Sequence, residues 1–316
     1  MKHKSILRKL AAAVLSCTLC CIGLTVPAAS ADEAAELPAR FDWREEEPEI
    51  LTPLKAQIGN TCWAYSTIAC AEANLIRKGL ADSSIDLSES HLIWFTECQG
   101  APTNPDDPRY GGGHNKGIEG CRDTGSVKSA VTALAAWQGV IPESDAASHA
   151  DMQPLDESLR YQSIAHLQNT ESYPLDEPQT VKAKIAEKGP MILMYYNSND
   201  DPISAQHGYY NADYAECKEQ GTLSGMLHDV VVVGWDDSFA KENFNDQPPA
   251  DGAWIIRDSQ SERIKNGNDY FYMSYYEPSI QLFYQLDFEP VTNYANVHHY
   301  NCSDLHGSLC RADILF

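Results

Sequence analysis

The order of the predicted elements indicates an α+β fold with two subdomains. Apolar residues at helical spacing dominate the first half of the chain, whereas short β-branched or aromatic runs bounded by turn residues dominate the second half. Regular alternation of strands and helices would instead favour βαβ units, so this segregation predicts a mostly helical half followed by an antiparallel β half. Because ligand sites commonly lie between two such halves, we expect the functional site in the cleft between them.

The chain has 316 residues and is predicted to divide into four regions. Residues 1–31 have the pattern of a signal peptide: basic residues, then the uncharged apolar run Leu10–Val26, then the small residues Ala29-Ser30-Ala31. A membrane anchor is the alternative, but a run of about 17 residues is short for a bilayer span. We therefore expect no membrane segment after cleavage. The other regions are a short acidic tether (32–40), one large domain (41–290) and a C-terminal tail (291–316). The tail is expected to belong to a short or truncated form of a longer protein.

Composition disfavours several classes of partner and cofactor. The formal net charge is −22, and such acidity argues against nucleic acid and anionic membrane surfaces as partners. Three of the ten cysteines lie in the predicted signal peptide. The odd number that remains leaves one thiol over in an exported protein, while the disulfide pairing stays open. The remaining cysteines form no paired C-x-x-C, so we expect no zinc site. We also expect no other metal and no cofactor.

Helices are predicted mainly before residue 140. The segment Thr61–Lys78 places Ala64, Ile68, Ala71 and Leu75 on one apolar stripe, and Gly79 is a suitable stop. The other predicted helices begin at Ser88 and run through Phe95, span Ser126–Gln138, and span Val181–Lys188. Between the second and third helices, residues 99–125 are rich in Pro, Gly, Asp and Asn and are predicted to form a long loop.

Strands are predicted in four short segments of the second half. These segments are Met191–Tyr196, Asp229–Trp235, Ala253–Arg257 and Tyr270–Tyr276. Each is rich in β-branched or aromatic residues and is flanked by turn residues.

Three polar residues stand at the ends of predicted elements. Cys62 lies in the first turn of the first predicted helix, where the positive end of the helix dipole favours the nucleophilic thiolate. His228 precedes a buried apolar strand, and Asp258 follows the next one. A carboxylate that accepts the imidazole N–H and orients the ring is the arrangement of an activated nucleophile. Taken singly, a buried structural cysteine or a surface histidine is the commoner outcome.

Together these segments resemble the papain-like cysteine peptidase family, in particular its bacterial secreted or cell-surface members. The similar segments are Gln57 with Cys62-Trp63-Ala64-Tyr65-Ser66, the helix start Leu87-Ser88-Glu89-Ser90, His228–Trp235, and Gly252-Ala253-Trp254. The resemblance extends from about Leu37 to about Pro290. It implies the papain-like two-subdomain fold, with Cys62 as nucleophile and His228 as the base. It also implies that Gln57 donates its side-chain amide to the oxyanion hole beside the Cys62 backbone N–H.

Two segments depart from the family pattern. Where the family has Asn-Ser-Trp-Gly, this chain has Asp258-Ser259-Gln260-Ser261, so an anion replaces an amide and the shielding Trp is missing. An anion favours imidazolium more strongly than an amide does. The family's substrate-binding glycine pair corresponds to the stretch 119–126, where Gly125 is expected to keep part of that role and Asp123 to add a negative charge. A turn-forming structural role for Gly125 is the alternative.

The resemblance implies a secreted bacterial cysteine endopeptidase, free or attached to the cell surface, that acts as a monomer on protein or peptide substrates through a Cys62 acyl-enzyme. The alternative from another class is a catalytically impaired binding or surface protein on the same fold. The departure at Asp258 is the observation that keeps this alternative open.

Overall fold

The computed structural model describes residues 37–98, 116–123, 125–147, 152–200 and 202–294. The chain divides into two units, 1–36 and 37–316, and only the second contains described residues. The predicted signal peptide, most of the predicted loop and most of the predicted tail therefore lie outside the described residues. Within the described ranges, no helix combines the length and apolarity needed to cross a bilayer.

Helices dominate the first half, as predicted. The longest is α2, which is buried on nearly all sides between Cys62 and Leu75 and not only along its predicted apolar stripe. Ser88 and Ser126 each cap a helix, because their side chains accept a backbone N–H three residues later. The helices are α1 (Trp43–Glu46), α2 (Cys62–Arg77), α3 (Glu89–Ile93), the π-helical turn η2 (Trp94–Cys98), α4 (Gly117–Gly120), α5 (Val127–Ala135), α6 (Pro178–Lys188), α7 (Tyr214–Gln220) and α8 (Ser261–Lys265).

The strands form one mixed sheet, and all but one of its pairings are antiparallel. The order along the sheet is β2-β8-β3-β5-β6-β7-β4, and β1 pairs separately with β5. The bounds are β1 (Arg40–Asp42), β2 (Ala165–Tyr173), β3 (Met191–Ser198), β4 (Gly208–Tyr209), β5 (Gly225–Asp236), β6 (Ala253–Arg257), β7 (Tyr270–Ser274) and β8 (Ile280–Pro290). The α+β fold predicted from the sequence is confirmed.

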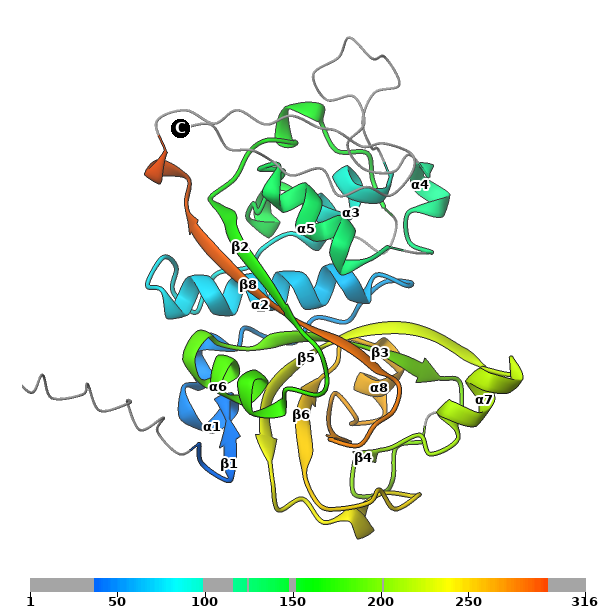
Figure 1. Ribbon diagram of the computed structural model, residues 1–316. Coiled ribbons are helices and arrows are strands. Elements are labelled where there is room, and N and C mark those ends of the chain that lie inside the picture. The colour runs from blue at the N-terminus through cyan, green and yellow to red at the C-terminus, as the bar shows by residue number, and fades with distance from the viewer. Residues whose placement is uncertain (1–36, 99–115, 124, 148–151, 201, 295–316) are drawn as a thin grey trace, which may run out of the picture. The chain divides into compact units, whose positions relative to one another are not determined.

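Helix α2 lies where the helical half meets the sheet (Figure 1). It contacts α3 and α5 on one side and β3, β5 and β8 on the other. Large side chains that are almost fully buried, among them Trp63 of α2 and Tyr195 of β3, belong to one continuous apolar core. The first turn of α2 and the middle of β5 are therefore both held by packing rather than by loops.

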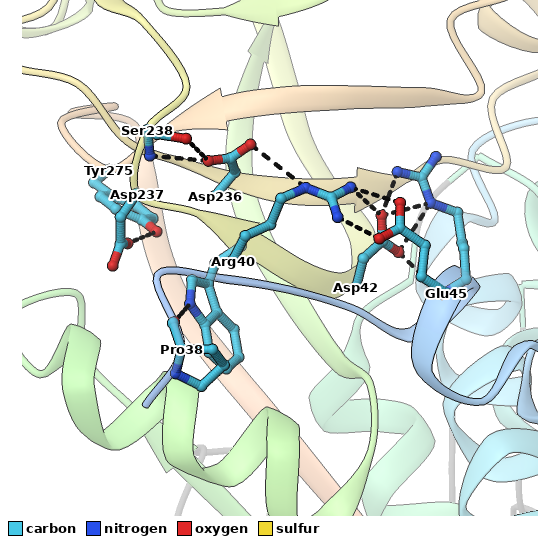
Figure 2. Close-up of polar contacts among 10 residues, drawn as sticks. Pro38, Arg40, Asp42, Glu45, Asp236, Asp237, Ser238 and Tyr275 are labelled. Atoms are coloured by element: carbon cyan, nitrogen blue, oxygen red, sulfur yellow. Dashed lines mark hydrogen bonds and ion pairs between the residues drawn. The ribbon is translucent and has the colours of Figure 1, made fainter. Parts of the chain in front are cut away.

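The segment before α1 is anchored along β5 (Figure 2). Arg40 contacts Asp236 with an Nε to Oδ2 distance of 3.5 Å and also pairs with Asp42 and Glu45. The carbonyl of Pro38 accepts a hydrogen bond from the Trp235 indole at 2.9 Å. The tether predicted over 32–40 is thus too long, because its last residues belong to the folded domain.

Several elements differ from their predicted bounds. Strand β5 begins at Gly225, so His228 lies inside a strand that was predicted to start after it. Strands β1, β2, β4 and β8 and helices α1, α4, α7 and α8 were not predicted, and α4 lies within the segment 99–125 that was predicted to be a loop. At the other end, Tyr294 hydrogen bonds to Gln168 and Asn293 to His166, so the domain continues past Pro290 into the segment that was predicted to be tail.

One disulfide joins Cys98 at the end of η2 to Cys121 just after α4. Its two cysteines flank the stretch 99–115, most of the predicted long loop. Among the described cysteines, Cys62, Cys70 and Cys217 are free. The sequence had left this pairing open.

Candidate active site

Cys62 is the first residue of α2 and is only 7% exposed. The preceding Thr61 gives this helix no side-chain cap; its hydroxyl donates instead to the carbonyl of Ile58 at 2.9 Å. Because a helix start carries N–H groups without intrahelical partners, this arrangement keeps the positive end of α2 directed at the sulfur. The position suits a thiolate, and the same N–H groups suit the oxyanion that forms when a thiolate attacks a carbonyl.

His228 is brought to Cys62 by β5, and Asp258 lies on its other side. The His228 Nε2 donates to Asp258 Oδ1 at 2.9 Å, and the Cys62 side chain lies close enough to the same ring to raise its pKa. All three side chains are buried, with Asp258 at 0% exposure. The structure therefore brings together the nucleophile, base and orienting carboxylate that were predicted from three distant segments.

The charges of these groups support each other. Burial lowers the pKa of His228, but the carboxylate of Asp258 and the sulfur of Cys62 outweigh it and raise that pKa to about 10. Burial likewise raises the pKa of Asp258, yet His228 and Arg263 hold it below its usual value. An imidazolium flanked by two anions is the protonation state that a thiolate–imidazolium pair requires.

Gln57 is fixed by the segment that follows Asp258. Its backbone N–H donates to Ser259 O at 2.8 Å, its carbonyl accepts from Ser261 Oγ at 2.9 Å, and its side-chain oxygen accepts from Ser259 Oγ at 3.0 Å. Its side-chain nitrogen donates to Gly59 O at 2.8 Å. An amide nitrogen has two N–H donors, so this bond uses one of them. The two serines therefore have a defined task in a segment that departs from the family pattern.

Gly125 lies against the indole next to Cys62. A Cβ on Gly125 would be 2.0 Å from Trp63 Nε1, and its φ is not in the left-handed region. The close approach, and not a turn, therefore explains why glycine occupies this position. Asp123 is exposed, and its carbonyl accepts from Asn60 Nδ2 at 3.1 Å. Both residues that were expected to bind substrate thus lie beside the start of α2.

A small cavity of about 20 Å³ is lined by sequence neighbours of the site residues. Both halves of the domain line it, and its lining includes Ser66, Glu89, Asp229 and Ser259. Asp229 follows the histidine and is 5% exposed, and its Oδ1 has no hydrogen-bond partner among the described residues. Burial raises the pKa of Asp229 to about 7, against the opposing effect of His228. The sequence-based prediction did not include this buried acid.

Arg263 is a second residue that the sequence-based prediction missed. It belongs to α8, is 2% exposed, and places its Nη1 3.2 Å from Asp258 Oδ2. In the sequence it stands in the polar run Ser261–Asn268, whose composition is typical of an exposed helix and turn. No local pattern there signals a buried arginine.

Comparisons with known proteins identify the family. The family model described as "Papain family cysteine protease" matches residues 37–281. Cysteine proteinase 2 of Entamoeba histolytica is 24% identical over 71% of the chain, and rat procathepsin L is 24% identical over the same share. The chain matches 60% and 57% of the length of these two proteins.

The fold is also found among solved structures. The cysteine protease and lectin-like domains of Cwp84, a surface layer associated protein of Clostridium difficile, superpose with a TM-score of 0.62 at 21% identity. That match covers 81% of this chain and 53% of the other.

Proposed function

Because the chain belongs to the papain family of cysteine proteases, we propose that it is an active cysteine endopeptidase with Cys62 as its nucleophile. The observation that carries this proposal is the buried series Cys62–His228–Asp258, in which His228 donates to Asp258 and Cys62 helps to raise the pKa of the His228 ring. All of these residues come from one chain, so the proposed site needs no residue from a partner subunit, and the proposed enzyme is a monomer. The signal-like pattern of residues 1–31 supports export from a bacterial cell.

The first half of the proposed reaction forms an acyl-enzyme. The Cys62 thiolate attacks the carbonyl carbon of the scissile peptide bond, and the carbonyl oxygen becomes an oxyanion. The Cys62 backbone N–H and the second N–H of the Gln57 amide are the proposed donors to that oxygen. The His228 imidazolium then gives its proton to the leaving nitrogen as the C–N bond breaks, which leaves a thioester on Cys62 and a neutral imidazole.

The second half regenerates the enzyme. The neutral His228 takes a proton from water, the resulting hydroxide adds to the thioester carbonyl, and the C–S bond breaks to release a carboxylic acid. Asp258 keeps the ring in place throughout, because its Oδ1 accepts from Nε2 in both halves. Asp123 and Gly125 are proposed to border the bound peptide, since both lie beside the start of α2.

Hydrolysis of a fluorogenic peptide mixture, measured for the wild type and for Cys62→Ala, tests the proposal. We expect turnover in the wild type, its loss in the variant, and a mass increase on Cys62 during turnover that matches an acyl group. Equal residual rates in the two proteins would contradict the proposal and favour the catalytically impaired alternative. Circular dichroism of both proteins controls for folding.

A further inference from the structure

The four buried side chains at the site carry balanced charges. In the thiolate–imidazolium state, Cys62 and Asp258 are negative, and His228 and Arg263 are positive. Without the arginine, three buried charges would leave one uncompensated anion beside the histidine. Such an anion is costly inside a protein unless it is paired. The arginine therefore supplies the missing counter-charge for a carboxylate at this position.

The guanidinium is fixed by groups outside the Cys–His pair. Its Nη2 donates to Asn197 Oδ1 of β3 at 2.8 Å, and its central carbon stands 4.6 Å from the centre of the Phe271 ring of β7. The Tyr209 ring of β4 is 5.5 Å away. The guanidinium held in this way forms an ion pair with Asp258, with Nη1 3.2 Å from Oδ2 but without hydrogen-bond geometry.

The carboxylate of Asp258 is thereby divided between two partners. Its Oδ1 accepts from His228 Nε2 and from the Gln260 backbone N–H, both at 2.9 Å, while its Oδ2 faces Arg263 Nη1 at 3.2 Å. We propose that Arg263 is a positioning residue that orients Asp258 toward His228 and offsets its negative charge. Because Arg263 offsets the charge of Asp258, the pair has no net charge. It therefore offers the imidazole a hydrogen-bond acceptor much as the neutral Asn amide of the family pattern does.

This inference rests on the proposed peptidase site. It predicts that Arg263 and Asp258 are coupled through their charges, so that the effect of replacing one on His228 depends on the other. The charged or titratable groups around the His228 ring are Cys62 of α2, Asp258 after β6, Arg263 of α8 and the adjacent Asp229, with the Tyr195 ring of β3 against its edge. Removing the arginine leaves the carboxylate unbalanced and stabilises the imidazolium further. Removing the carboxylate takes away the anion that accepts from His228 Nε2 and destabilises the imidazolium. Removing both restores the balance.

The test is a double-mutant cycle of Arg263→Met, Asp258→Asn and both together, with Lys265→Met as control. Lys265 lies on the same helix but is exposed and pairs only locally with Glu262. Two readouts are used: kcat/KM for a peptide, and the pH dependence of Cys62 alkylation by iodoacetamide, which needs no turnover. Absence of turnover in the wild type would fail the proposed function, while the alkylation profile would still test the arginine.

We expect the upper pKa of the Cys62–His228 pair to rise by about half a unit or more in Arg263→Met and to fall in Asp258→Asn. In the double variant it should lie between the two. For kcat/KM we expect a loss of about tenfold or more in Arg263→Met, with the double variant more active than the product of the single losses predicts. Arg263→Lys should recover part of the loss, whereas Lys265→Met should match the wild type.

Two results would overturn the inference. One is an alkylation profile in Arg263→Met that coincides with that of the wild type. The other is multiplicative losses in the double variant, which would show that the two residues act independently. If Arg263→Met does not fold, as judged by circular dichroism, the comparison of Arg263→Lys with the double variant carries the same test.

Discussion

Asp229 is predicted to lower the stability of the protein as pH rises. The pKa of this carboxyl is raised from an ordinary value of 3.8 to about 7, because burial penalises its charged form more than the neighbouring His228 favours it. Between these values the folded state holds a proton that the unfolded state has lost. The free energy of unfolding therefore falls as pH rises through this window and is lowest above pH 7.

Replacing Asp229 by Asn removes this titration and keeps the size of the side chain. A difference of about 3 pKa units corresponds to about 4 kcal/mol, which sets the upper limit of the gain above pH 7. At the lower limit of the window, near the ordinary pKa of aspartate, the gain in stability should vanish. There the side chain at position 229 is neutral in the folded wild type and in the variant alike. Asp229→Asn is thus predicted to be the more stable protein at pH 8 and equal to the wild type near pH 3.5.

Urea unfolding monitored by circular dichroism at several pH values between 3.5 and 8 measures this difference. Asp246→Asn is the matched control, because Asp246 is exposed and its replacement should change stability equally little at every pH. A stability difference for Asp229→Asn that does not change with pH would refute the reasoning. So would a variant less stable than the wild type at pH 8.

Three further predictions concern the site and its support. Because Asp258 and the sulfur raise the pKa of His228 to about 10 despite the lowering effect of burial, peptide hydrolysis should persist well above pH 8, and a decline centred near pH 6.5 would contradict this. Gly125→Ala should displace Trp63, lower kcat/KM and cost roughly 1–3 kcal/mol of stability in urea unfolding, since its Cβ would be 2.0 Å from the indole nitrogen. Replacing both Cys98 and Cys121 by Ser should remove about 3 kcal/mol and lower Tm by several degrees, and an unchanged Tm would show that the disulfide gives no net support.

The sequence predicted those parts of the fold whose local pattern matches their environment. Helix α2 has one apolar stripe and a glycine just past its end, and strand β6 is apolar up to its last residue, Arg257, so both were found with correct or nearly correct bounds. Strand β2 was missed because its second half is exposed and polar, and only its pairing with β8 defines it as a strand. Pairing between distant segments is invisible to local periodicity.

The site shows the same limit. Taken singly, Cys62 and His228 carry weak local signals, and they were predicted because their segments together resemble one family. Arg263 is different, because its burial depends on Asn197 and Phe271, which come from other strands. The unexpected carboxylate at Asp258 is visible in the sequence, whereas the residue that balances its charge is recognised only from the tertiary structure.

The most direct test of the Cys62–His228 pair is a competition between thiols within the same protein. Cys62 is buried, whereas the free Cys217 is more exposed, so exposure alone predicts faster alkylation of Cys217. Brief treatment with iodoacetamide at pH 5.5, followed by peptide mass spectrometry, gives the two rates in the wild type and in His228→Ala. The account predicts that Cys62 reacts faster in the wild type and loses that advantage in the variant. Faster labelling of Cys217 in both proteins would contradict it.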